Sequence, residues 1–260
     1  MDEFAIDDRG NFLRYFDLYS GSEAFEPLFY IHGLGCASSS DYPPVVSANS
    51  YAQRRSLLVD LMGSGFSDKP PDGTYHSQAQ AAVLSDFVAS QGCSRVTLFG
   101  HSAGAFIALK LAQKLPIQVS TLILCEPGLT EYGIAMLSEI ASQTEAQFVD
   151  GGFAQLLAQL KIQGGNDAWL GPFSVASPHA IHQWAQSAIE DNSSHWLDDL
   201  ANLNAIKGVV LSDTATRDQI AKFEQAGCTV ELVADTEHMI AYDNPDGLAL
   251  AISNLLDLGK

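Results

Sequence analysis

The chain has 260 residues, of which 47% are hydrophobic and 17% charged, which is enough for one large domain with an ample core. Its 31 acidic and 13 basic residues give a formal net charge of −18, which argues against nucleic acids and anionic membrane surfaces as partners. No apolar run approaches the ~20 residues that span a bilayer, and the acidic N-terminus lacks the features of a secretory signal. We therefore expect a soluble cytoplasmic protein with no membrane partner.

The chain begins with a predicted hairpin, because residues 4–7 and 12–19 flank the turn residues 8–11. Short apolar runs rich in Val, Ile, Leu and Phe follow, and they are typical of buried parallel strands: 28–31, 56–59, 96–99, 121–125, 208–211 and 229–233. Helical spacing occupies residues 78–90, 103–114, 216–225 and 245–256. The alternation predicts an α/β fold with one eight-stranded, mostly parallel sheet.

Nearly eighty residues without a convincing strand interrupt this alternation between Gly128 and Ala205. Helical patterns with apolar faces predict an inserted helical cap, and they occupy residues 134–149, 153–162, 178–190 and 194–203. We thus expect a core of residues 1–127 and 206–260 and a cap of residues 128–205. Aromatic cap residues are candidates to bind the substrate, or they form the cap's own core: Trp169, Phe173, Trp184 and Trp196.

The stretch Gly100-His101-Ser102-Ala103-Gly104 matches the pattern G-x-S-x-G. Chance supplies this pattern in about one chain in six of this composition, so the context must decide. Here the pattern lies between an apolar strand and a predicted helix, where a strained turn exposes the serine oxygen at the end of the sheet. The sequence therefore favours Ser102 as a nucleophile over a small residue that only fills a tight turn.

A serine nucleophile needs a histidine base, and the chain has seven histidines. His238 lies in a short loop after the last predicted strand, at the same carboxyl edge of the sheet as Ser102. His101 adjoins Ser102, but it occupies the variable position of the turn, so we expect its ring to point away. His238 is therefore the candidate base.

Four segments in order resemble the α/β-hydrolase family: "YIHGLG", "DLMGSGFSDKP", "GHSAGA" and "EHMIAYDNP". The resemblance covers nearly the whole chain and implies an eight-stranded sheet whose second strand is antiparallel. It also implies the chain order serine, acid, histidine. It assigns the oxyanion hole to two backbone N–H groups, those of Leu34 and Ala103.

The sequence leaves open which residue is the acid that orients His238. Members of the family usually carry it after the seventh strand, where this chain reads "GVVLSDTATRDQ" and departs from the usual pattern. A minority place it one strand earlier, where Glu126 ends the apolar run "LILC". We favour Glu126, with Asp213 and Asp218 as the alternatives.

These residues predict a serine hydrolase that cleaves a small, largely apolar carboxylic ester or lactone through an acyl-enzyme. We expect no cofactor and no metal, since no pair of cysteines has metal-ligand spacing. The same triad also serves C–C bond hydrolysis, perhydrolysis and amide hydrolysis, and a hydrolase scaffold can serve as a small-molecule receptor. The sequence leaves the oligomeric state and the exact substrate open.

Overall fold

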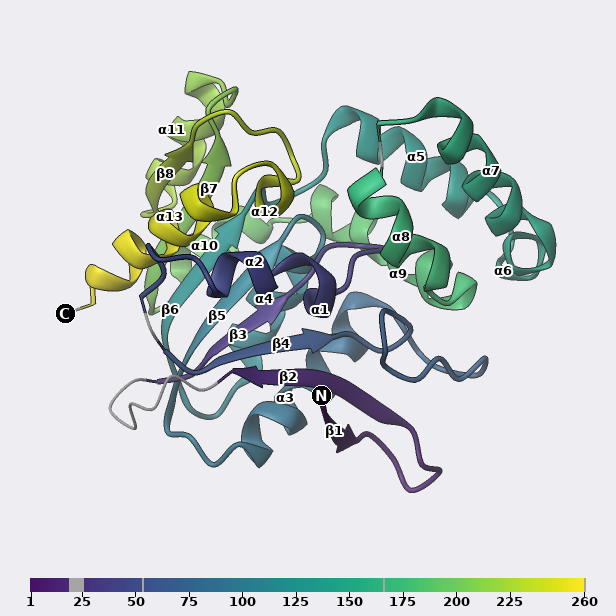
Figure 1. Ribbon diagram of the computed structural model, residues 1–260, viewed down its shortest axis with the longest axis horizontal. Coiled ribbons are helices and arrows are strands. Elements are labelled where there is room, and N and C mark those ends of the chain that lie inside the picture. Colours follow the sequence, from purple (N-terminus) through teal and green to yellow (C-terminus); the bar gives the residue numbers. More distant parts are fainter. Residues whose placement is uncertain (19–25, 53, 166, 260) are drawn as a thin grey trace.

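One eight-stranded sheet organises the molecule, a computed structural model that describes residues 1–18, 26–52, 54–165 and 167–259. The strand order is β1-β2-β4-β3-β5-β6-β7-β8, and β2 is antiparallel to both of its neighbours (Figure 1). All other neighbours are parallel. The strands are β1 (Asp2–Ala5), β2 (Phe12–Leu18), β3 (Leu28–Ile31), β4 (Ser56–Asp60), β5 (Arg95–His101), β6 (Gln118–Cys125), β7 (Ile206–Ser212) and β8 (Thr229–Val233). The predicted fold class and all eight strands are confirmed, although residue 19 of the predicted hairpin lies outside the described residues.

Helices cover both faces of the sheet and produce two separate apolar cores. One core contains Phe29 and Leu98 with Phe87 of α3, and the other contains Tyr30 and Phe99. Because successive strand residues point to opposite faces, the sequence Phe29-Tyr30 supplies one aromatic ring to each core. The helices outside the region between β6 and β7 are α1 (Ser38–Asp41), α2 (Pro43–Val46), α3 (Ser77–Ser90), α4 (Gly104–Lys114), α11 (Arg217–Gln225), α12 (Ile240–Asp243) and α13 (Pro245–Asp257).

The residues between β6 and β7, which we call the helical insertion, form a group of helices beside the sheet (teal and green in Figure 1). These are α5 (Glu131–Ser142), α6 (Glu145–Gln147), the π-helix η1 (Phe148–Gly152), α7 (Phe153–Gln163), α8 (Asp167–Val175), α9 (Pro178–Ser193) and α10 (Trp196–Asn202). The single helix expected over residues 134–149 is wrong, because a capping box between Thr144 and Gln147 starts a new helix. The sequence patterns also missed α8, which contains Pro172.

A buried polar contact ties the insertion to the core. Asp191 of α9 accepts a hydrogen bond from Ser77 Oγ of α3 (2.6 Å) and pairs with Lys110 Nζ of α4 (2.9 Å). Asp191 is only 9% exposed, so both partners help to offset the cost of its burial. The contact fixes α9 against the helix that follows Ser102. No helix of the described residues is long and apolar enough to cross a membrane.

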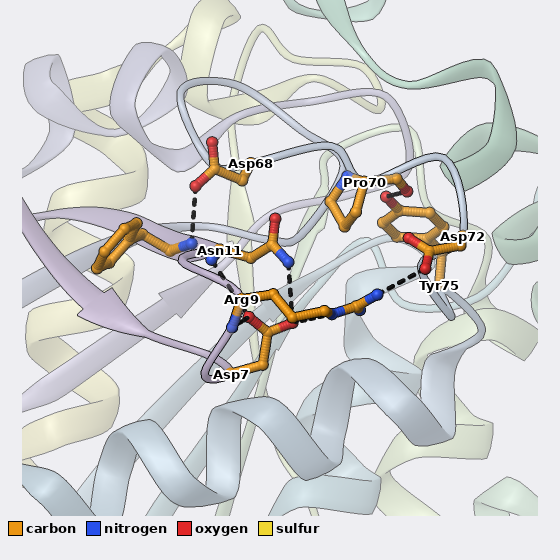
Figure 2. Close-up of polar contacts among 8 residues, drawn as sticks. Asp7, Arg9, Asn11, Asp68, Pro70, Asp72 and Tyr75 are labelled. Carbon is orange, nitrogen blue, oxygen red and sulfur yellow. Dashed lines mark hydrogen bonds and ion pairs between the residues drawn. The ribbon is translucent and has the colours of Figure 1, made fainter.

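The turn of the β1–β2 hairpin holds the loop that follows β4 (Figure 2). Arg9 bridges Asp7 and Asp72, and its Nη1 lies 2.6 Å from Asp72 Oδ2. The Phe12 N–H donates to Asp68 Oδ2 at 2.7 Å, so strand β2 begins with a direct bond to the same loop. The ion pairs are exposed and contribute little to stability individually. Together with the Phe12 bond they set the position of the loop.

Candidate active site

Ser102 follows strand β5 on a sharp turn into α4. Its φ is 53°, in the left-handed region that non-glycine residues rarely adopt. The Ser102 N–H donates to the Cys125 carbonyl of β6 at 3.0 Å, which anchors the turn to the next strand. The serine hydroxyl is partly exposed, whereas both of its neighbours are buried. The turn therefore presents the hydroxyl from a rigid, packed base.

The two glycines of the turn are required by close packing. A Cβ on Gly104 would lie 2.2 Å from the His32 carbonyl oxygen, and one on Gly100 would lie 2.7 Å from Ala108 Cβ. Any side chain at Gly104 would meet backbone that cannot move aside easily. The G-x-S-x-G spacing thus allows α4 to start directly against β3 and β5.

His238 faces Ser102 from the loop after β8. The His238 Nε2 atom lies 2.9 Å from Ser102 Oγ, within hydrogen-bond reach. The two residues are 136 positions apart in the sequence. The structure therefore brings together Ser102 and His238, for which the sequence predicts the roles of nucleophile and base.

Glu126 lies on the far side of the His238 ring. Its Oε2 atom is 3.5 Å from His238 Nδ1, an ion-pair distance longer than a typical hydrogen bond. Its Oε1 atom accepts a hydrogen bond of 2.7 Å from the Ser212 N–H at the end of β7. The φ of Glu126 is 45°, so this residue shares the left-handed backbone of Ser102. At the strand end where the family usually carries the acid, this chain instead offers a backbone donor that orients Glu126.

The alternative acids lie elsewhere. Asp213 is exposed, and its Oδ2 atom accepts from the Asp235 N–H at 3.2 Å. Asp218 is exposed in the first turn of α11. Of the three candidates, Glu126 is the one in contact with His238.

The expected oxyanion donors line the same cavity as Ser102. Leu34 lies in the turn after β3, and Ala103 is the N-cap residue of α4. Backbone N–H groups at a helix N-terminus have no acceptor within the helix and favour negative charge. This argument applies to Ala103, whereas Leu34 shares only the cavity with Ser102, and the role of both N–H groups in an oxyanion hole stays a prediction.

A cavity of about 360 Å³ opens over Ser102 between the core and the insertion. Core loops contribute its floor, and α5 and α8 contribute much of its wall. Its apolar lining includes Leu34, Leu129, Met136, Leu137 and Trp169. Two carboxylates, Glu237 and Asp243, lie on the side of His238, and no lysine or arginine occurs among the described lining residues. The cavity therefore suits an uncharged, largely apolar molecule better than an anion.

The four aromatic candidates have different positions. Trp169 lines the cavity, and Phe173 supports it from behind with a ring-centroid distance of 4.3 Å. Phe173, Trp184 and Trp196 do not line the cavity, so the prediction that they bind the substrate is wrong for these three residues. Trp184 is buried in the core beside His32, and Trp196 packs edge-on against Phe106 of α4. These two rings pack the insertion against the core of the molecule, so they differ from both predicted roles, a substrate site and a core of the cap alone.

His101 also differs from expectation, because its ring lies against the site. Its Nε2 atom is 3.0 Å from the His238 carbonyl oxygen, and the two rings are 5.1 Å apart. Burial, with a smaller effect of nearby His238, lowers the pKa of His101 to about 3. A neutral His101 can donate from Nε2 to this carbonyl, so it supports the backbone of the base.

Sequence reasoning missed the cavity residues contributed by the start of α5. Tyr132, Gly133 and Met136 line the wall, together with Leu129 and Thr130 just before the helix. Their signal was the apolar, helical spacing directly after the strand that carries Glu126. A helix that starts at the carboxyl edge of the sheet is placed to cover Ser102.

Comparison with known proteins identifies the fold family of the chain. A family model described as "alpha/beta hydrolase fold" matches residues 26–167, more than half of the chain. The chain is 32% identical to 2-hydroxymuconate semialdehyde hydrolase of Pseudomonas putida over 108 residues, 42% of this chain and 38% of that protein. It is also 32% identical to Lipase 1 of Psychrobacter immobilis over 108 residues, 41% of this chain and 33% of that protein. These matches span well under half the length of either relative.

Solved structures share the fold across nearly the whole chain. A thermophilic esterase from Thermogutta terrifontis superposes with a TM-score of 0.75 at 17% identity and covers 96% of this chain and 94% of its own. E-2-(acetamidomethylene)succinate hydrolase gives a TM-score of 0.70 at 21% identity and covers 98% of each chain. At these identities the likeness concerns the fold alone.

Proposed function

Because the chain belongs to the α/β-hydrolase fold family, we propose that it is a serine hydrolase acting on a small, uncharged, largely apolar carboxylic ester or lactone. The observation that carries the proposal is the 2.9 Å contact between Ser102 Oγ and His238 Nε2 at the floor of the cavity. Residues 128–205 serve as the cap that encloses the substrate.

In the first half of the reaction, Ser102 attacks the carbonyl carbon while His238 accepts its proton. The negative charge that develops on the carbonyl oxygen is stabilised by the N–H groups of Leu34 and Ala103. The protonated His238 then donates its proton to the departing alcohol, which leaves an acyl-enzyme on Ser102. Glu126 stabilises the imidazolium and holds its Nδ1 proton on the far side of the ring.

In the second half, a water molecule gives a proton to His238 and attacks the acyl carbon. The second tetrahedral intermediate collapses when His238 returns the proton to Ser102, which releases the carboxylic acid. The Glu126 carboxylate, whose Oε2 lies 3.5 Å from His238 Nδ1, favours electrostatically the tautomer that carries its proton at Nδ1 and accepts a proton at Nε2 in each half.

The charge of the cavity favours an uncharged substrate. Glu237 and Asp243 lie near His238, and the described lining contains no cationic side chain that would neutralise a substrate carboxylate. C–C bond hydrolysis is the second candidate, because the chain is similar to the 2-hydroxymuconate semialdehyde hydrolase of Pseudomonas putida. A muconate is an anion near neutral pH, and this cavity is poorly suited to one, so we place ester hydrolysis first.

The test compares wild type with Ser102→Ala on 4-nitrophenyl esters of two to eight acyl carbons and on a hemisuccinate ester of the same alcohol. We expect turnover of the neutral esters, a loss of about 10³-fold or more in Ser102→Ala, and a much lower kcat/KM for the anionic hemisuccinate. Equal rates for wild type and Ser102→Ala would show that Ser102 is not the nucleophile. An inert wild type that binds an apolar ester tightly would instead identify a receptor.

A further inference from the structure

Trp169 of the insertion contacts the turn after β3. Its Nε1 atom donates a hydrogen bond of 2.9 Å to the Leu34 carbonyl oxygen, 135 residues away in the sequence. The same tryptophan lines the cavity above Ser102. One side chain therefore contacts both the substrate space and the loop of the proposed oxyanion hole.

Close packing fixes Trp169 against the turn that carries Leu34 and Gly35. The rings of Trp169 and Phe173 lie 4.3 Å apart and press on Gly35, whose φ is +72°. A Cβ on Gly35 would lie 2.3 Å from Phe173 Cδ2 and 3.0 Å from Trp169 Nε1. The loop and α8 thus fit together only because residue 35 has no side chain.

The two peptide groups that flank Leu34 are held from opposite sides. On one side, the Gly33 carbonyl accepts from the Cys36 N–H at 3.1 Å and lies 2.8 Å from His32 Nδ1, both within the core. On the other side, the Leu34 carbonyl is held by Trp169 of the insertion. The direction of the Leu34 N–H, which belongs to the first peptide, depends on both anchors.

We propose that Trp169 is a positioning residue that fixes the Leu34 N–H toward the reacting carbonyl, an inference that rests on the proposed function. The indole N–H restrains the peptide after Leu34, so the oxyanion donor is in place before the substrate arrives. Donors fixed in advance stabilise a transition state because they need no reorganisation as charge develops. The position of α8 therefore sets the catalytic rate as well as the shape of the cavity.

The direct test is Trp169→Phe, which removes the indole N–H and keeps an aromatic ring. Trp184→Phe is the matched control, because Trp184 is outside the cavity and its Nε1 has no hydrogen-bond acceptor among the described residues. The assays measure kcat and KM on a neutral 4-nitrophenyl ester. They also measure inhibition by a trifluoromethyl ketone, which forms an oxyanion on the serine, and by the matching methyl ketone.

We expect Trp169→Phe to lower kcat by about 10- to 100-fold with KM within about threefold, since removal of one oxyanion donor outright costs 10²–10³-fold. The inhibition constant of the trifluoromethyl ketone should rise by a similar factor, and that of the methyl ketone should change little. Trp184→Phe should stay within about twofold of wild type in kcat. Gly35→Ala, which displaces the aromatic pair, should reproduce the loss of kcat.

Two results would overturn the inference. If Trp169→Phe raises KM and leaves kcat unchanged, Trp169 is only a wall of the cavity. If Trp169→Phe and Gly35→Ala both keep the wild-type kcat, the contact does not affect the oxyanion donor. In either case an active wild type with an inactive Ser102→Ala would leave the proposed function standing, whereas an inert wild type would overturn both.

Discussion

Ser102 and Glu126 share a backbone conformation that costs about 1–3 kcal/mol for a residue with a side chain. Each follows the end of a parallel strand, and each N–H donates to the next strand of the sheet. Ser102 donates to the Cys125 carbonyl at 3.0 Å, and Glu126 donates to the Val210 carbonyl at 2.9 Å. The same turn geometry, a positive φ with the N–H bonded to the next strand, therefore directs both side chains toward His238.

The first prediction concerns the acid. Glu126→Gln keeps the size of the side chain and removes the charge that stabilises the His238 imidazolium, so we expect kcat to fall by about 10²–10⁴-fold. Asp213→Asn is the matched control and should remain within about twofold, because Asp213 contacts Asp235. Steady-state kinetics on a neutral ester measure kcat for both variants. A large loss in Asp213→Asn with little change in Glu126→Gln would assign the acid to Asp213.

The second prediction concerns pH and His101, whose pKa burial lowers from 6.5 to about 3. As the pH falls below 6.5, the unfolded chain binds a proton here that the folded protein does not bind until about pH 3. The free energy of unfolding therefore decreases by up to ~1.4 kcal/mol per pH unit in this range. The contribution of His101 is fully present above pH 6.5 and is lost toward pH 3.

Urea unfolding at pH 7 and pH 5 measures this effect. His101→Gln should lose less stability between the two pH values than wild type, because it removes one of the groups that the unfolded chain protonates. His195→Gln is the control, since the His195 side chain is 96% exposed, and it should follow wild type. Equal pH slopes for wild type and His101→Gln would contradict the prediction.

At the scale of elements, two short helices link the halves of the site. Helix α1 follows the turn that carries Leu34, and α12 follows His238. Tyr242 of α12 donates to Asp41 Oδ1 at 2.6 Å, and Ser40 Oγ donates to the same oxygen at 2.8 Å. Asp41 is 3% exposed, and burial raises its pKa. The link joins segments 201 residues apart and connects the helix after His238 to the helix after the turn that carries Leu34.

The third prediction follows from the burial of this carboxylate. Tyr242→Phe removes one of its donors, so we expect the free energy of unfolding to decrease by about 1–3 kcal/mol. Tyr132→Phe is the control, because the Tyr132 hydroxyl makes an exposed hydrogen bond to Gln163, and its effect should stay below about 0.5 kcal/mol. Urea unfolding at pH 7 measures both, and equal effects would contradict the role of the link.

The sequence predicted elements well where one physical signal dominated. Strands β3 and β8 have the predicted bounds, because short apolar runs have few other stable arrangements. Strand β3 is buried throughout as predicted, whereas β8 forms an edge of the sheet and buries only Val233. The helix expected over residues 134–149 failed although its break was encoded: Thr144 and Gln147 have the spacing of a capping box. Helix α8 was not predicted, because Gly171 and Pro172 weaken the helical pattern of its sequence. Packing against the turn after β3 stabilises this helix instead.

At the scale of the whole molecule, strand order explains why the polar site residues could be predicted and the aromatic ones could not. Ser102, Glu126 and His238 follow parallel strands, so the topology alone brings them to one edge of the sheet. The positions of Trp184 and Trp196 depend on how helices of the insertion rotate against the core. An apolar ring can serve a cavity or a core equally well, so the sequence holds no signal that separates the two.

The proposed reaction requires Ser102 as its nucleophile, and covalent labelling can identify the reactive residue. The protein is treated with a fluorophosphonate, and intact mass spectrometry with peptide mapping locates the adduct. We expect one adduct per chain, on Ser102, with none in Ser102→Ala and labelling slowed about 100-fold or more in His238→Gln. An adduct on another residue, or no adduct on a protein that hydrolyses esters, would contradict the account.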